Sequence, residues 1–246
     1  MRKGVGVSED SEILERAMRY PYAVPARSFV QQGHRTLDPA EVEIDREQRS
    51  RLLVYGSNAS PESLARKLAL SADPVLVEPA WLHDFDVVYS AHFAAYGAVP
   101  ATLQRSPGTT VRVAIIHLTA EQLRLVSATE PNYELTSLDT ATCELPDGEA
   151  ATQLSAYISR HGCLLADGEE VALVAVPARE RRFAELSEPQ VLERLRLQLC
   201  PEESIDAFVL GGVTDPDLAQ ARSAQLERRE TDAGRSSRAT RYRTSP

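Results

Sequence analysis

The sequence contains little cysteine, and its three cysteines, Cys143, Cys163 and Cys200, do not have the spacing of a zinc or redox motif. An odd number of cysteines without such a motif predicts reduced thiols in a cytosolic protein, rather than a disulfide-bonded secreted one. The five histidines also lack metal-ligand spacing, so we expect no bound metal.

Long hydrophobic runs are absent too. No apolar stretch approaches the length of a membrane span, and residues 8–12 are polar where a signal peptide would be apolar. We therefore predict a cytoplasmic protein without membrane contact. Positive charge is scarce, because 27 lysines and arginines face 36 aspartates and glutamates, for a net charge of -9. Such a surface repels phosphate backbones, so we expect a small-molecule ligand and no nucleic acid. The oligomeric state is not readable from the sequence.

The chain does have enough apolar residues for one sizeable core, since 43% of its 246 residues are hydrophobic. Its composition changes along the chain. Residues 1–49 are predicted to be an N-terminal extension with a short amphipathic helix over 11–20. Residues 50–215 are predicted to be the folded domain. Residues 216–246 are predicted to be the end of a C-terminal helix and a disordered tail that begins near Arg222, because arginine, serine and threonine dominate there.

Within the central domain, strand-like segments mostly follow one another, and few helices interrupt them. Helices are expected after Pro61, with Ser60 as the cap, after Thr119, and over residues 187–199. A regular alternation of strand and helix is absent, so we predict an α+β fold on a mixed or antiparallel sheet. The predicted strands cover residues 52–55, 74–77, 86–90, 101–103, 111–118, 136–145 and 153–158, with a turn at 106–108.

A short apolar strand ends in Tyr55, Gly56, Ser57 and Asn58. Gly56 allows a sharp turn without the penalty of a Cβ atom, and Ser57 and Asn58 offer hydrogen-bonding groups. The helix that begins near Pro61 adds unpaired N–H groups and a partial positive charge. Together these features suit a bound carboxylate. Without further context, however, this arrangement is usually only a turn with a helix cap.

This loop resembles the signature loop of the γ-glutamylcyclotransferase family. Further along the chain, that family has an acidic residue at the end of a helix with the pattern Leu-x-x-aliphatic-x-x-x-Glu, which residues 123–130 match. Tyr133 follows, as a tyrosine usually does, and Tyr157 lies in a strand like one that contributes a pocket tyrosine. The resemblance covers about residues 51–160. It implies a small mixed β-barrel of the γ-glutamylcyclotransferase type with flanking helices.

The resemblance also implies a reaction, in which the substrate's own α-amine attacks its γ-carbonyl and releases 5-oxoproline and an amine. Because the nucleophile is tethered, ring closure requires no enzyme nucleophile, metal or cofactor. It requires one group that takes a proton from the α-ammonium and returns it to the leaving amine. That role would fall to Glu130, while Tyr55, Gly56, Ser57 and Asn58 hold the γ-glutamyl group. Tyr133 and Tyr157 would shape the pocket.

Two other interpretations stay open. The same fold can bind a small ligand or a partner protein without turnover, or it can catalyse hydrolysis or acyl transfer instead. Asp86, Ser90 and His92 alternate along one strand, but the residues of a catalytic triad must converge, so we interpret His92 as a pocket-wall or structural histidine. The leaving amine would be selected by the far side of the pocket. Residues 89–97 and the N-terminal extension are the candidates for that side.

Overall fold

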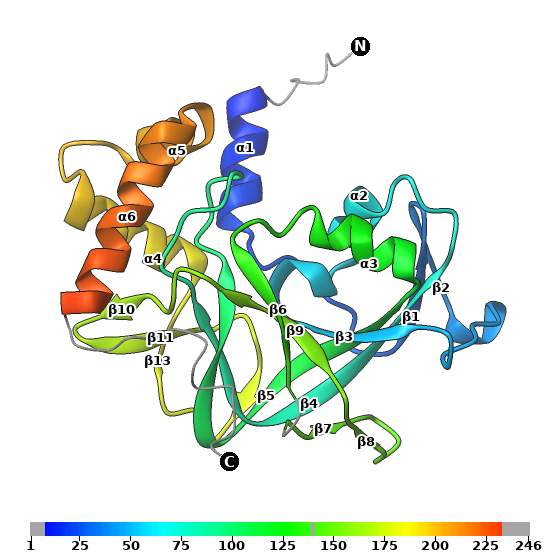
Figure 1. The fold of residues 1–246 in the computed structure, drawn as a ribbon. Coiled ribbons are helices and arrows are strands. Elements are labelled where there is room, and N and C mark those ends of the chain that lie inside the picture. Colours follow the sequence, from blue (N-terminus) through cyan, green and yellow to red (C-terminus); the bar gives the residue numbers. More distant parts are fainter. Residues whose placement is uncertain (1–7, 139–140, 233–246) are drawn as a thin grey trace, which may run out of the picture.

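The computed structural model describes residues 8–138 and 141–232, and a long antiparallel pair of strands forms its centre (Figure 1). These strands are β4 (Val75–Tyr89) and β5 (Ala101–Leu118). The strand that leads into the predicted loop, β3 (Ser50–Val54), pairs with β5. The other strands are short: β1 (Phe29–Gln32), β2 (Arg35–Leu37), β6 (Tyr133–Ser137), β7 (Cys143–Glu144), β8 (Ala150–Ala151), β9 (Ser155–Ser159), β10 (Leu165–Ala166), β11 (Glu169–Leu173), β12 (Ala178–Arg179) and β13 (Ala184–Leu186).

The sheet is mixed, which confirms the predicted α+β class, but it is open. Its main path of paired strands is β10-β11-β4-β5-β3-β9-β6. Within the described residues, the two end strands β10 and β6 do not pair with each other. The small mixed β-barrel that the resemblance implied is therefore not shown. Along the edge of β4 that faces away from β5, three short strands pair with successive segments of β4: β1, β7 and β11. In the described residues, β6 pairs with β9 alone. Most pairs are antiparallel, and β3–β9 and β11–β13 are parallel.

The turn predicted at residues 106–108 was wrong, because β5 continues through it. Gly108 and Asp84 both have left-handed backbones, with φ of 86° and 61°. The Gly108 N–H donates to Asp84 Oδ1 at 2.8 Å, and the register of β4 against β5 shifts between His83 and Phe85. A bulge uses the same residue types as a turn, so the local sequence did not distinguish the two. The two strands predicted at 74–77 and 86–90 are therefore one strand, β4, and those predicted at 101–103 and 111–118 are one strand, β5.

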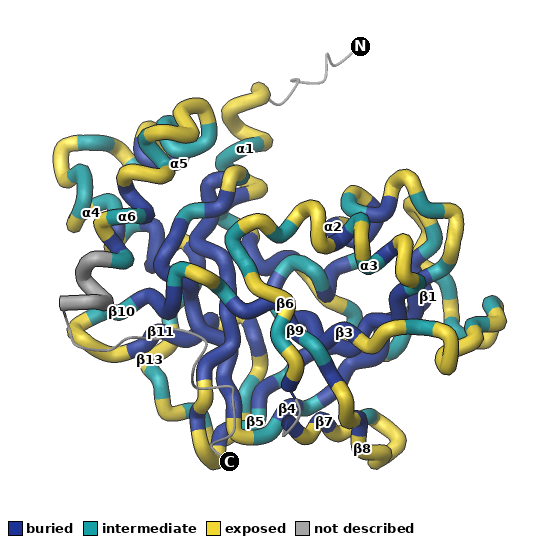
Figure 2. The backbone as a smooth tube through the Cα atoms, viewed as in Figure 1, coloured by how far each residue is buried: buried dark blue, intermediate teal, exposed yellow. Residues whose placement is uncertain are grey.

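Apolar side chains pack on both faces of the sheet at β3. Leu53 belongs to one buried cluster, and its neighbours Leu52 and Val54 belong to the other. Figure 2 shows that the central strands are buried along most of their length. Helices α2 (Pro61–Lys67) and α3 (Ala120–Ser127) pack on the second cluster, and α1 (Glu9–Met18), α4 (Glu188–Leu199), α5 (Ile205–Thr214) and α6 (Pro216–Asp232) pack on the first (Figure 1).

The helix starts follow the predicted caps. The Ser60 hydroxyl accepts from the Ser63 N–H at 3.2 Å, and Pro61 is the first residue of α2. Thr119 and Gln122 form a capping box at the start of α3. Helix α6 continues through the buried Arg222, so the tail does not begin there. Residues 233–246 lie outside the described part of the chain.

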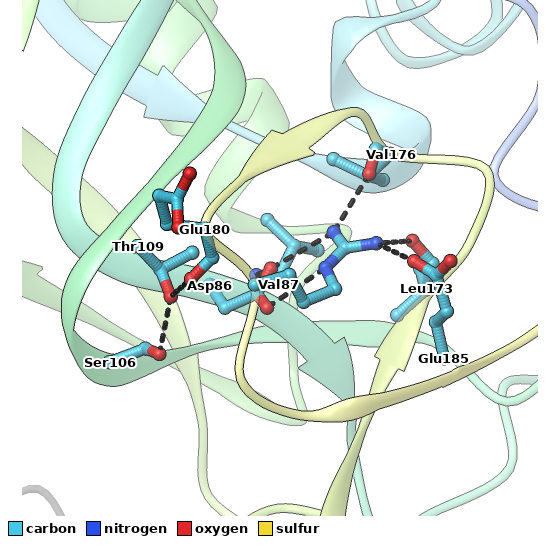
Figure 3. Close-up of polar contacts among 9 residues, drawn as sticks. Asp86, Val87, Ser106, Thr109, Leu173, Val176, Glu180 and Glu185 are labelled. Carbon is cyan, nitrogen blue, oxygen red and sulfur yellow. Dashed lines mark hydrogen bonds and ion pairs between the residues drawn. The ribbon is translucent and has the colours of Figure 1, made fainter.

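An ion pair between Asp86 of β4 and Arg181, which follows β12, lies at one end of the long strand pair (Figure 3). The guanidinium group donates to both carboxylate oxygens, each at 3.0 Å, and also to the carbonyls of Leu173 and Val176. Asp86 is fully buried. Burial raises the pKa of this carboxyl, and the hydrogen bonds with Arg181 act against that rise. Arg181 therefore links β4 to the segment 173–181.

Candidate functional site

A cavity of about 390 Å³ lies where the loop after β3 meets the turn after α3. It has the size of a small-molecule site. The cavity brings together residues that are far apart in the sequence, and every predicted site residue except Gly56 lines it. Those residues are Tyr55, Ser57, Asn58, Glu130, Tyr133 and Tyr157. Gly56 lines a neighbouring cavity of about 490 Å³.

Gly56 shapes the loop for two reasons. Its φ of 67° favours glycine, as the sequence indicated. A Cβ atom at this position would also overlap the hydroxyl of Tyr20. That hydroxyl accepts from the Ala101 N–H at 2.8 Å. The absence of a side chain at Gly56 therefore lets residue 20 of the N-terminal extension reach the start of β5 behind the loop.

Glu130 faces the loop from the turn that follows α3. The side-chain amide of Asn58 donates to its Oε1 at 2.9 Å, and the ammonium of Lys67 forms an ion pair with the same oxygen. The Glu130 side chain is only 10% exposed and that of Lys67 18%. No donor among the described residues binds Oε2. The carboxylate is thus fixed through one oxygen, and the other oxygen remains available to a ligand.

Asn58 offers a second unused group. Because a carboxylate only accepts hydrogen bonds, the contact with Glu130 identifies the donating atom as Nδ2 and leaves Oδ1 as the acceptor. Oδ1 is buried and has no hydrogen-bond partner within the described residues. A buried acceptor without a partner costs free energy unless a ligand or water supplies a donor. Asn58 and Glu130 line the same cavity, and Glu130 Oε2 is an acceptor suited to a ligand that carries N–H groups.

The three predicted tyrosines contribute their rings, since each hydroxyl is already bonded within the protein. Tyr55 donates to the Tyr157 carbonyl, and Tyr133 donates to the Ala101 carbonyl at 2.9 Å. The Tyr157 hydroxyl shares a hydrogen bond of 2.6 Å with Ser127. Burial raises the pKa of all three hydroxyls. They therefore stay protonated, and their rings form the walls of the cavity.

His92 lines the cavity but does not belong to a catalytic triad. Its Nδ1 lies 2.8 Å from the Ser90 hydroxyl, and its ring stacks on His161 with centroids 4.4 Å apart. Burial lowers the pKa of His92, and the nearby His161 lowers it further. Asp86 is bonded to Arg181 instead. The expectation of a pocket-wall histidine therefore fits the geometry.

Both segments that the sequence proposed for the far side of the pocket line this cavity. Helix α1 and the residues after it contribute Arg16, Tyr20 and Tyr22, and residues 89–97 contribute Tyr96. The three tyrosine rings form a cluster, with centroids 6.0 to 6.3 Å apart. Sequence reasoning missed the individual side chains here, and it also missed Lys67. The only signal for Lys67 was its place in the last turn of the helix that follows the loop.

A buried glutamate supports the cavity from behind. Glu188, in the first turn of α4, accepts from the Val99 N–H at 2.7 Å, and its second oxygen has no partner in the described chain. Burial raises the pKa of Glu188 well above its ordinary value of 4.5. Val99 lies two residues before Ala101, whose backbone binds Tyr20 and Tyr133. Glu188 thus helps to position the segment that holds two wall tyrosines.

This burial predicts a pH-dependent stability. The folded protein favours the neutral form of Glu188, whereas the unfolded chain ionises it near pH 4.5. The free energy of unfolding is therefore highest below pH 4.5, where Glu188 is neutral in both states. It decreases as the pH rises from 4.5 through the pKa of Glu188 in the folded protein. We expect Glu188→Gln, which cannot ionise, to be more stable than wild type by about 1–3 kcal/mol at pH 8, and to lose this advantage at pH 4.5. Urea unfolding at both pH values, with the exposed Glu202→Gln as control, measures the difference. An advantage that does not change with pH would contradict the assignment.

The described residues show neither a metal site nor a membrane-spanning helix. No group of three or more histidine, cysteine, aspartate or glutamate side chains in the described residues is arranged to hold a metal ion. In the same part of the chain, no helix is both long enough and apolar enough to cross a membrane.

No protein-family model and no curated protein matches the chain. Several solved structures resemble it weakly. A solution structure from Arabidopsis thaliana is 22% identical, covers 46% of this chain and 62% of its own, and has a TM-score of 0.34. A structure described as a gamma-glutamyl cyclotransferase is 18% identical, with coverage of 45% and 66% and a TM-score of 0.34. An uncharacterized protein from Homo sapiens is 14% identical, with coverage of 65% and 86% and a TM-score of 0.38. The chain thus spans less than two thirds of the Arabidopsis structure, and at these scores the function must be inferred from the pocket itself.

Proposed function

We propose that the chain is a γ-glutamylcyclotransferase-like enzyme, a cyclising lyase or acyltransferase that releases 5-oxoproline and an amine from a γ-glutamyl peptide or γ-glutamyl amine. One observation carries this proposal. Tyr55, Ser57 and Asn58 of the loop line one cavity with Glu130, and Asn58 donates to Glu130 at 2.9 Å. Glu130 Oε2 remains as an acceptor for the ligand. A free α-ammonium group of a γ-glutamyl compound matches it.

The reaction that this arrangement supports has one proton carrier. Glu130 Oε2 takes a proton from the α-ammonium, which becomes a neutral amine. The amine nitrogen attacks the γ-carbonyl carbon and forms the lactam C–N bond. The bond from that carbon to the leaving nitrogen then breaks, and Glu130 returns the proton to the leaving nitrogen. The lactam nitrogen still carries one extra proton, which Glu130 passes in the same way to the freed amine, so that the amine leaves as an ammonium ion. No water enters, and the products are 5-oxoproline and the free amine. Closure of a five-membered ring by a tethered nucleophile has a high effective molarity, so positioning and proton transfer are what the protein must supply.

Lys67 has a defined part in this proposal. Its ammonium holds Glu130 Oε1, so the carboxylate is oriented before the substrate binds. The positive charge also compensates Glu130, which is mostly buried. When the substrate's α-ammonium approaches Oε2, the carboxylate is shared between two cations.

The test is a panel of γ-glutamyl compounds with different leaving amines, incubated with purified protein and assayed for 5-oxoproline and free amine in equal amounts. We expect at least one compound to give both products in a 1:1 ratio. Free glutamate in place of 5-oxoproline would indicate hydrolysis, and transfer of the glutamyl group to an added amine would indicate an acyltransferase. Saturable binding without any product would support the alternative function, a small-ligand or partner-binding protein on the same fold.

A further inference from the structure

The second cavity, of about 490 Å³, adjoins the first and has no part in the proposed reaction. Its lining comes from residues 19–26 of the N-terminal extension, from the end of β3 with the loop after it, and from residues 175–177 before β12. Its volume is that of a small-molecule site. Four residues line both cavities: Tyr20, Tyr22, Val54 and Tyr55.

The lining of the second cavity is mostly apolar. Besides the tyrosines, it consists mainly of alanine, valine and proline side chains, among them Val24, Pro25, Ala59, Pro79, Val113 and Val176. Within the described residues, the charged side chains that line it are Arg19 and Arg112, and none is acidic. Lining cations attract anionic ligands, even in a chain with a net charge of -9. A ligand with an apolar body and one negative charge would match this lining.

Arg112 is the lining cation that lacks an anionic partner. Arg19 pairs with Glu15 at 3.1 Å, whereas no carboxylate of the described residues forms an ion pair with Arg112. The Arg112 guanidinium group donates to the Ala26 carbonyl at 2.6 Å and lies over the Trp81 ring, 5.4 Å from the centroid. Stacking of this kind holds an arginine in place and leaves N–H groups for a ligand.

A second arginine stacks on the same indole ring. The Arg179 guanidinium group lies 4.2 Å from the Trp81 centroid, and it too has no ion pair with a carboxylate of the described chain. Burial lowers the pKa of Arg112, and the nearby Arg179 lowers it further. Two guanidinium groups on one ring without a carboxylate between them repel each other, and a bound anion would relieve that repulsion.

We propose that this cavity is a separate binding site for a small apolar carboxylate, whose hydrocarbon part lies against the apolar lining and whose carboxylate pairs with Arg112. A guanidinium group recognises a carboxylate through paired N–H donors. Each methylene group that the cavity removes from water adds to the affinity, which favours a chain of several carbons. A cationic ligand of the same shape would meet Arg112 and Arg179 as like charges.

Four probes that differ in charge or chain length test the proposal: octanoate, 1-octanol, octylammonium and acetate. Each is titrated calorimetrically into the purified full-length chain at neutral pH, below the concentration at which the octyl compounds form micelles. We expect octanoate to bind about tenfold more tightly than octanol, because octanol lacks the ion pair. Octylammonium should bind most weakly of the octyl compounds, and acetate should show no saturable binding, because it lacks the chain.

Arg112→Gln tests the charge. It should weaken octanoate binding about tenfold and change octanol binding by about twofold or less, because only the ion pair is lost. Arg105→Gln is the matched control, since Arg105 also lies on β5 and stacks on an aromatic ring, that of Phe85, but does not line the cavity. It should bind both compounds as wild type does.

Ala175→Trp tests the location. Ala175 lines the cavity but is exposed, so an indole ring there can occupy the cavity without entering the core. Octanoate and octanol should both lose affinity by about tenfold or more, because the apolar contacts are replaced. Val174→Trp changes the exposed neighbour, which does not line the cavity, and should keep both affinities. Octanoate binding that survives in Ala175→Trp would place the ligand elsewhere, such as in the first cavity, and would overturn the proposal.

Three other results would also overturn it. They are the absence of saturable octanoate binding to wild type, equal affinities of wild type for octanoate and octanol, and equal losses of both compounds in Arg112→Gln. The last result would show a changed cavity rather than a lost ion pair. None of these measurements uses the release of 5-oxoproline, so this site and the proposed function can fail independently.

Discussion

Replacing Glu130 with glutamine should reduce the release of 5-oxoproline by about 10²- to 10⁴-fold, the range that a positioned general acid/base contributes. Glutamine has nearly the same shape, and its carbonyl oxygen can still accept from Asn58 Nδ2. It cannot take a proton from the α-ammonium, so kcat should fall while ligand affinity changes by only a few fold. Product release with the best compound of the panel measures kcat, and calorimetric titration measures affinity.

The control for this variant is Glu134→Gln. Glu134 lies four residues further on, is exposed on β6 and does not line the cavity, so its replacement should leave activity unchanged. Thermal unfolding of both variants shows whether Lys67 without its partner destabilises the fold. Turnover of Glu130→Gln at the wild-type rate would exclude Glu130 as the proton carrier and would leave the cavity as a binding site only.

The largest expected loss of stability lies away from the cavity, at Arg181. Arg181→Met should reduce the free energy of unfolding by about 3–5 kcal/mol, because it leaves Asp86 as a fully buried carboxylate without its cation. It also removes the donors that bind the carbonyls of Leu173 and Val176. Methionine occupies a similar volume, so the loss reflects the polar contacts more than the packing. Urea unfolding at neutral pH gives the difference.

Two further variants make that result specific. Arg182→Met changes an exposed neighbour and should cost little. The double variant Asp86→Leu/Arg181→Met should recover part of the lost stability, because burial of the Asp86 charge is itself unfavourable, as the raised pKa of this carboxyl indicates. A double variant less stable than Arg181→Met alone would show that Asp86 stabilises the fold by more than its pairing with Arg181.

Local chemistry explains what the sequence predicted well. The caps at Ser60 and Thr119 and the turn at Gly56 each depend on contacts within a few residues, so the residue types alone identified them. The same local rules failed at residues 106–108, because glycine there serves a bulge between paired strands. Local rules also could not predict that the sheet stays open, because this depends on which strands pair with the edge of β4.

The sequence by itself determined the α+β class, the loop at residues 55–58 and the choice of Glu130 as the candidate acid. Only the tertiary structure decided how these parts meet. Lys67 reaches Glu130 from 63 residues away in the sequence, and Tyr20 reaches Ala101 from 81 residues away. The position of Arg16 depends on α1 packing near the cavity. Such contacts follow from the packing of the whole sheet and its helices, and no spacing within a short segment specifies them.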